Sequence, residues 1–136
     1  MSLKKVAEKD KFSMTYHKVL YVIEGLLVFR DLMNIATSVF AGQSSVYRTV
    51  DIIFYVAMIV ANVIAIVRHD YKVGVFAFYT FLILELSLNI LVFTLAFTQG
   101  LDISEMITTI ISLTIGSVVW FVCTFIYYKK RWSILK

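Results

Sequence analysis

The sequence predicts an all-α integral membrane protein, built as an antiparallel four-helix transmembrane bundle with short loops. Composition is the first reason, because 60% of the 136 residues are apolar, only 16% are charged, and the mean hydropathy is +0.85. A soluble domain is typically about 45–50% apolar and about 25% charged, so lipid is the expected solvent. The second reason is distribution, since the apolar residues gather in four long stretches with basic residues at their ends.

The four stretches are each long enough to cross the hydrocarbon core of a bilayer, which is about 30 Å thick and needs about 20 helical residues. They cover residues 17–41, 50–67, 73–97 and 107–128. Their length favours helices over barrel strands, which would be about 9–11 residues long with alternating polarity. The second stretch has the shortest apolar core, and we expect it to be the weakest span. The whole chain is expected to form one domain, 1–136.

The boundaries between the stretches carry residues that end or begin helices. Gly42, Gly74 and Gly100 fall there, where turns are expected. Thr49 is placed to cap the second stretch, and residues 102–105 resemble a capping box that opens the fourth. Because the connections are short, we expect consecutive helices to be antiparallel neighbours.

The positions of lysine and arginine predict the orientation of the bundle. Cytoplasmic ends of membrane proteins carry an excess of these residues. One face has eleven of them: Lys4, Lys5, Lys9, Lys11, Lys18, Arg68, Lys72, Lys129, Lys130, Arg131 and Lys136. The opposite face has Arg48 alone. We therefore expect a multi-pass protein of the cell membrane with both termini in the cytoplasm.

Several polar side chains lie inside the predicted spans. An ionisable side chain at the bilayer centre costs at least about 2.5–3.5 kcal/mol on insertion scales, so each one needs a partner, water or a function. The predicted intramembrane polar network consists of Glu24, Arg30, Asp31, Asn34, Asn62, Glu85 and Asn89.

Depth within the membrane predicts which of these residues meet. The first and third spans run in the same direction, and Arg30 and Glu85 match in depth to within about 1.5 Å, one helical rise. We therefore predict an ion pair between Arg30 and Glu85. Asp31 is the competitor for Arg30, but it points about 100° away on its own helix. We expect Asp31 to share the face of Glu24, seven residues earlier.

The fourth span carries a stripe of small and hydroxyl side chains. Thr109, Ser112, Gly116 and Trp120 recur at three- and four-residue spacing, so they share one face of a helix. Small residues let membrane helices approach closely. We expect this stripe to pack against a neighbouring helix.

Two functions remain open at this point. The leading prediction is a non-enzymatic protein that acts through helix–helix assembly, as a homo-oligomer or an accessory subunit, with a structural polar network. The alternative is a proton- or ion-coupled small transporter or channel subunit that uses Glu24, Asp31 and Glu85, because these carboxylates outnumber Arg30. A water-filled cavity that reaches Glu85 or Glu24 would favour transport. A dry, fully paired interior would favour assembly.

Other classes of function have less support. His17 and His69 fall near the same ends of adjacent spans, so an interfacial haem is a minor alternative. The sequence has no phosphate-binding loop, no recognisable nucleophile and no metal-ligand grouping, so we predict no catalytic residue, metal or cofactor. The basic residues lie at segment ends rather than along one helix face, which predicts the lipid bilayer, and not nucleic acid, as the partner.

Overall fold

The computed structural model describes residues 11–40, 45–100, 104–129 and 131–136, and all regular structure in these ranges is helical. Side chains are described throughout these ranges except at 11–14, 17, 45, 105, 106 and 109. The long helices are α2 (Lys11–Phe40), α3 (Ser45–Val67), α4 (Lys72–Thr98) and α5 (Ser104–Lys129), followed by the short 3-10 helix η1 (Trp132–Ile134).

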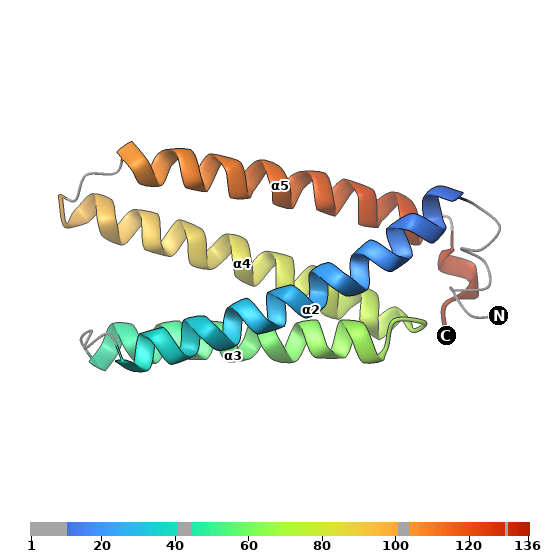
Figure 1. Cartoon of the computed structure of the whole chain (residues 1–136), viewed down its shortest axis with the longest axis horizontal. Helices are drawn as coiled ribbons and strands as arrows, with labels where there is room; N and C mark the ends of the chain where they lie inside the picture. Colours follow the sequence, from blue (N-terminus) through green and yellow to red (C-terminus); the bar gives the residue numbers. More distant parts are fainter. Residues whose placement is uncertain (1–10, 41–44, 101–103, 130) are drawn as a thin grey trace.

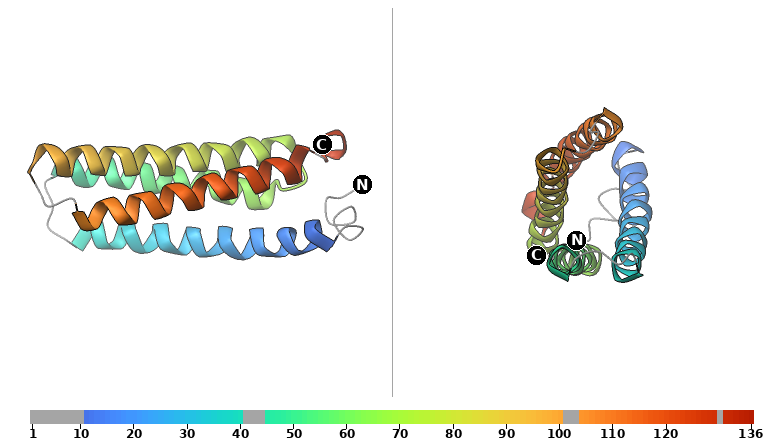
Figure 2. Two further views of the ribbon diagram at one scale, coloured as in Figure 1. Left: turned by 90° about the horizontal axis from the view of Figure 1, so that it is seen from above. Right: turned by 90° about the vertical axis from the view of Figure 1, so that its left-hand side faces the viewer.

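Consecutive long helices run antiparallel, and α2 begins at the same end of the bundle at which the chain finishes (Figure 1). This part of the fold prediction is confirmed. We call the end that contains the start of α2 and η1 the terminal end, and the opposite one the far end. Viewed along the bundle, α3 and α4 follow α2 in order, with α5 beyond α4 (Figure 2).

Three segments are long and apolar enough to cross a membrane: Val46–Val67, Lys72–Thr98 and Ile110–Lys129. They support a membrane-spanning helical bundle. The expectation that the second stretch would be the weakest is wrong, because α3 extends upstream to Ser45 and provides the most apolar of the three segments. Helix α2 is not among these three segments, because charged side chains interrupt its apolar run.

Helix ends differ from the prediction at one site and agree at another. Thr49 lies inside α3 and does not cap it, because the residues before it also fit a helix and lengthen α3 by about one turn. Gly100 ends α4 with a positive φ of 67°, and its N–H donates to the carbonyl of Phe97 at 3.2 Å. A positive φ of this kind favours glycine. Gly42 and the first residues of the 102–105 box lie outside the described residues.

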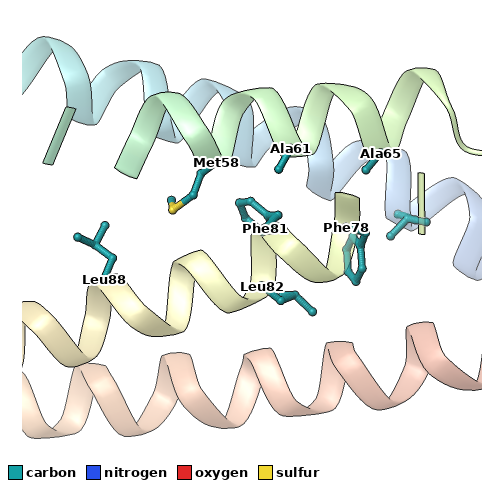
Figure 3. Close-up of a cluster of buried hydrophobic side chains, with 8 residues drawn as sticks. Met58, Ala61, Ala65, Phe78, Phe81, Leu82 and Leu88 are labelled. Carbon is teal, nitrogen blue, oxygen red and sulfur yellow. The ribbon is translucent and has the colours of Figure 1, made fainter. Parts of the chain in front are cut away.

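The core lies mainly between α3 and α4, and α2 packs along α3 and contributes Leu20 to the same cluster. Met58, Ala61 and Ala65 of α3 lie opposite the α4 side chains, as Figure 3 shows. The two alanines are four residues apart, so they share one face of α3, and their small side chains let α4 approach closely. The buried members of the cluster are Leu20, Met58, Ala61, Ala65, Phe78, Phe81, Leu82 and Leu88.

The fourth long helix, α5, packs mainly through aromatic side chains. The Trp120 ring meets Phe78 at 5.2 Å between centroids, and Phe121 meets Tyr79 of α4 at 5.1 Å. Toward the terminal end, Tyr16 of α2 also reaches α5. Figures 1 and 2 show that α2 and α5 separate from each other toward the far end. Among the described residues, the hydrogen bond and ring contact that join α2 to α5 lie near the terminal end.

A close backbone approach at Gly74 gives a first testable prediction. A Cβ atom at Gly74 would lie 2.1 Å from the carbonyl oxygen of Arg68, so the turn between α3 and α4 must shift to accept any side chain. We expect Gly74→Ala to lower the free energy of unfolding by about 1–3 kcal/mol, as overpacking does elsewhere. Denaturation in mixed detergent micelles, followed by circular dichroism, measures this change.

The matched control is Gly25→Ala, because Gly25 lies on α2 and a Cβ atom there would meet nothing within 4 Å. Alanine is the better helix former by about 1 kcal/mol in an exposed helix interior, so Gly25→Ala should be neutral or stabilising. Equal stability of the two variants would contradict the close approach at Gly74.

Candidate functional site: an ion-pair cluster beside an open pocket

Arg30 of α2 and Glu85 of α4 form a two-pronged ion pair. The Nη1 atom of Arg30 donates to Oε1 of Glu85 at 2.9 Å, and Nη2 donates to Oε2 at 2.6 Å. Parallel hydrogen bonds between a guanidinium and a carboxylate are shorter, stronger and more directional than neutral ones. The structure therefore contains the pair that the comparison of depths predicts, and the contact is direct.

Asp31 binds the same guanidinium, which corrects the expectation that it points away from Arg30. Both Nε and Nη2 of Arg30 donate to Oδ1 of Asp31, at 3.0 and 2.7 Å. The directions of the two Cα–Cβ bonds do diverge along the helix, but the long arginine side chain turns back so that its inner edge meets the neighbouring carboxylate. One guanidinium thus holds two carboxylates.

The three charged groups differ in how far they are enclosed. The side chain of Asp31 is 0% exposed, that of Glu85 is 13% exposed, and that of Arg30 is 35% exposed. The second oxygen of Asp31, Oδ2, is buried and accepts no hydrogen bond from the described residues. With all three groups ionised, the cluster carries one net negative charge.

Glu24 and Asn62 form a second polar site, closer to the terminal end. Glu24 is 1% exposed, and its Oε2 atom has no hydrogen-bond partner among the described side chains and backbone. The amide nitrogen of Asn62 donates to the backbone carbonyl of Glu24 at 3.0 Å, and the amide oxygen of Asn62 is buried without a partner in the same part of the chain. The interior therefore retains polar atoms that are not paired.

Asn34 and Asn89 are half-buried, and within the described residues neither makes a hydrogen bond to the Arg30 cluster. Across the same residues, no group of three or more His, Cys, Asp or Glu is arranged to hold a metal ion. His69 is buried, with its Nδ1 atom 3.4 Å from the Tyr128 hydroxyl and its ring 4.9 Å from that of Tyr21. The side chain of His17, the other histidine of the haem alternative, lies outside the described residues.

An open pocket of about 320 Å³ lies between α2, α4 and α5, with Arg30 and Glu85 in its wall. The rest of the wall is mainly apolar, with two serines and a glycine contributed by α5. The lining residues are Ile23, Leu27, Arg30, Phe81, Leu82, Glu85, Ser112, Leu113, Gly116, Ser117 and Trp120. Ligand pockets are typically about 300–1,000 Å³ and mostly apolar with a few convergent polar groups.

The small-residue stripe of α5 has a different role from the one predicted. Ser112 and Gly116 line the pocket rather than making a close helix contact, and a Cβ atom at Gly116 would meet nothing within 4 Å. Trp120, on the same stripe, does pack against α4. The contact between α5 and α4 is made by the large rings of Trp120 and Phe121 rather than by the small residues of the stripe. The side chain of Thr109 lies outside the described residues.

Tyrosines that the sequence places in an interfacial aromatic belt make specific contacts on the terminal side of this pocket, although none of them lines it. The Tyr16 hydroxyl forms a hydrogen bond with the Thr124 hydroxyl, and the Tyr16 ring lies 5.1 Å from that of Tyr127. Thr124 also donates to the carbonyl of Trp120 at 2.7 Å. No spacing rule links Tyr16 to Thr124, because 108 residues separate them.

Replacing one member of the ion-pair cluster tests its contribution to stability. We expect Glu85→Gln to lower the free energy of unfolding by on the order of 1–3 kcal/mol, because Arg30 then loses a charged acceptor that it binds twice. The double change Arg30→Met with Glu85→Leu should not restore stability, because it leaves Asp31 buried without its cation. Adding Asp31→Leu should recover much of the loss, since buried charges exchanged together for apolar residues are often tolerated.

Denaturation in mixed micelles measures all three variants against the unsubstituted chain. Full recovery in the double variant would show that Asp31 does not depend on Arg30. A Glu85→Gln variant as stable as the unsubstituted chain would contradict the contribution of the pair.

Comparison with known proteins adds no assignment. No protein-family model, no curated protein and no solved structure matches this chain. The features of this chain that bear on function are the Arg30 cluster, Glu24 and the pocket between α2, α4 and α5.

Proposed function

We propose that the chain is a small transporter of the cell membrane, linked to protons or ions, in which the pocket beside Arg30 and Glu85 receives the cargo. The single observation that carries this proposal is the pocket of about 320 Å³ that reaches both charged groups. The unpaired buried oxygens of Glu24 and Asp31 add support, because a fully paired interior would favour a purely structural network.

The proposal includes α2 as a fourth transmembrane helix. With 30 residues, α2 is about 45 Å long, which is enough to cross a bilayer. Its charged residues at mid-helix contact α4 or lie buried, so lipid does not have to solvate all of them. An even number of spans agrees with the start of α2 and the end of the chain lying together (Figure 1).

The shared guanidinium supplies a mechanism for ion or proton linkage. Arg30 carries one positive charge beside two carboxylates. A proton or cation that binds Asp31 or Glu85 therefore leaves Arg30 paired with the other carboxylate alone. Protonation of Glu85 would weaken the contact between α2 and α4, whereas protonation of Asp31 would leave that contact in place, and both helices line the pocket. Movement of α5 would complete the cycle, because its fastening to α2 is the hydrogen bond between Tyr16 and Thr124 together with the adjacent ring contact.

Assembly remains the second candidate, and the exposure of Arg30 favours it. More than a third of that side chain is accessible at mid-helix, and hydrocarbon solvates a guanidinium poorly. A second copy of the chain, or a helix of a larger membrane complex, would cover it. Mass measurement in detergent separates the candidates, since a functional monomer would contradict assembly.

Filling the pocket tests the transport proposal. We expect Gly116→Leu to lower flux into liposomes by roughly tenfold or more, because the new side chain occupies the space that a cargo needs. The fluxes to measure are those of protons, monovalent cations and a fluorescent hydrophobic cation. Gly25→Leu is the matched control, since Gly25 also has nothing within 4 Å and lies outside the pocket wall.

Two outcomes would contradict this proposal. One is the lack of flux for all of these cargoes in the unsubstituted protein. The other is an equal flux through the Gly116→Leu and Gly25→Leu variants when both fold and insert normally.

The orientation is tested separately, by labelling single cysteines in intact cells. In a Cys123→Ser background, Ser133→Cys places a thiol in η1 and Gln99→Cys places one at the end of α4, where both residues are exposed. With cytoplasmic termini, an impermeant maleimide should label Gln99→Cys in intact cells and Ser133→Cys only after lysis. The reverse pattern would contradict the predicted orientation.

A further inference from the structure

A second pocket, of about 340 Å³, lies at the terminal end between α4, α5 and η1. It is separate from the pocket beside Arg30 and shares no lining residue with it. Its wall consists of Val75, Tyr79, Phe125, Tyr128, Lys129 and Trp132. The wall is therefore aromatic and apolar apart from one lysine and the tyrosine hydroxyls.

Two lysines flank this pocket. The Lys129 ammonium lies 5.7 Å from the centre of the Phe125 ring, and the Lys72 ammonium lies 5.7 Å from the centre of the Trp132 ring. Neither lysine forms an ion pair within the described residues, and no lining residue is acidic. The site thus combines two positive charges with an apolar cavity and no compensating carboxylate in the wall.

Arg131, which directly precedes Trp132, does not line the pocket. Arg131 is buried, donates to the carbonyl of Tyr127 at 2.8 Å and stacks over the Tyr127 ring. The Arg131 charge therefore interacts with the carbonyl and ring of Tyr127 inside the fold. Arg131 is therefore not available to a ligand of this pocket, whereas Lys129 lines the pocket and Lys72 contacts Trp132 in its wall.

We propose that this pocket binds an anionic phospholipid, with an acyl chain against Val75, Tyr79 and Phe125 and the headgroup phosphate between Lys72 and Lys129. Basic pockets between transmembrane helices bind anionic headgroups, and tryptophan is enriched at the level of the headgroups. A zwitterionic lipid would place a cation beside the two lysines. A free phosphate ion would leave the apolar wall without a ligand.

Trp132 provides a direct reporter, because it lines the pocket and the chain has only two tryptophans. Trp120→Phe leaves Trp132 as the only fluorophore of its kind and keeps an aromatic ring at position 120. In phosphatidylcholine vesicles, quenching by brominated phosphatidylglycerol is compared with quenching by brominated phosphatidylcholine at equal mole fractions. We expect a preference of roughly tenfold for the anionic lipid, because both lysines act near the membrane surface.

The lysine variants decide whether the pocket causes this preference. Lys72→Gln with Lys129→Gln should bring the preference close to one. Lys18→Gln with Lys136→Gln removes the same charge from exposed positions at the same end and should retain most of it. Higher potassium chloride should weaken the preference in the parent protein, because salt screens exposed charges.

Equal quenching by the two brominated lipids would overturn the proposal, as would a preference that survives Lys72→Gln with Lys129→Gln. Loss of the preference in added inorganic phosphate, but not in potassium chloride of the same ionic strength, would assign the site to free phosphate instead. Native mass spectrometry of the chain with both tryptophans provides a second measurement if Trp120→Phe does not fold. It should retain phosphatidylglycerol over phosphatidylcholine, and the same lysine pair should abolish the difference.

Discussion

The guanidinium of Arg30 is the constraint on which the arrangement of the helices depends. It holds Asp31 on its own helix and Glu85 on α4 at the same time. Charges removed from water need partners, so α2 can lie in the bundle only in a register that brings Arg30 to Glu85. Because α3 packs against both α2 and α4, this contact also limits how α3 can be placed.

The apolar core and the ion pair together explain why the bundle is closed on one side and open on another. Alanines of α3 accept the rings of α4, so these two helices pack closely along their length. Trp120 and Phe121 hold α5 against α4 through bulky rings, and Gly116 adds no side chain farther along. The difference in side-chain size leaves the pocket beside Arg30.

The terminal end is bound together by backbone as well as by side chains. The N–H of Lys72 donates to the carbonyl of Lys136 at 3.0 Å, and the N–H of Lys136 donates to the carbonyl of Asp70 at 3.0 Å. These bonds hold η1 against the connection between α3 and α4. The tyrosine contacts between α2 and α5 lie at the same end, so movements that widen the pocket are easiest at the far end.

The sequence by itself determined the helical class, the antiparallel order and the Arg30–Glu85 contact. Apolar length, short connections and helical rise are local or one-dimensional quantities, and they can be read from spacing. Tertiary structure alone decided that Asp31 shares Arg30, that Ser112 and Gly116 line a pocket, and that Tyr16 meets Thr124. These outcomes depend on side-chain rotamers and on the angle between helices, which are set by the sizes of all the side chains that pack between them.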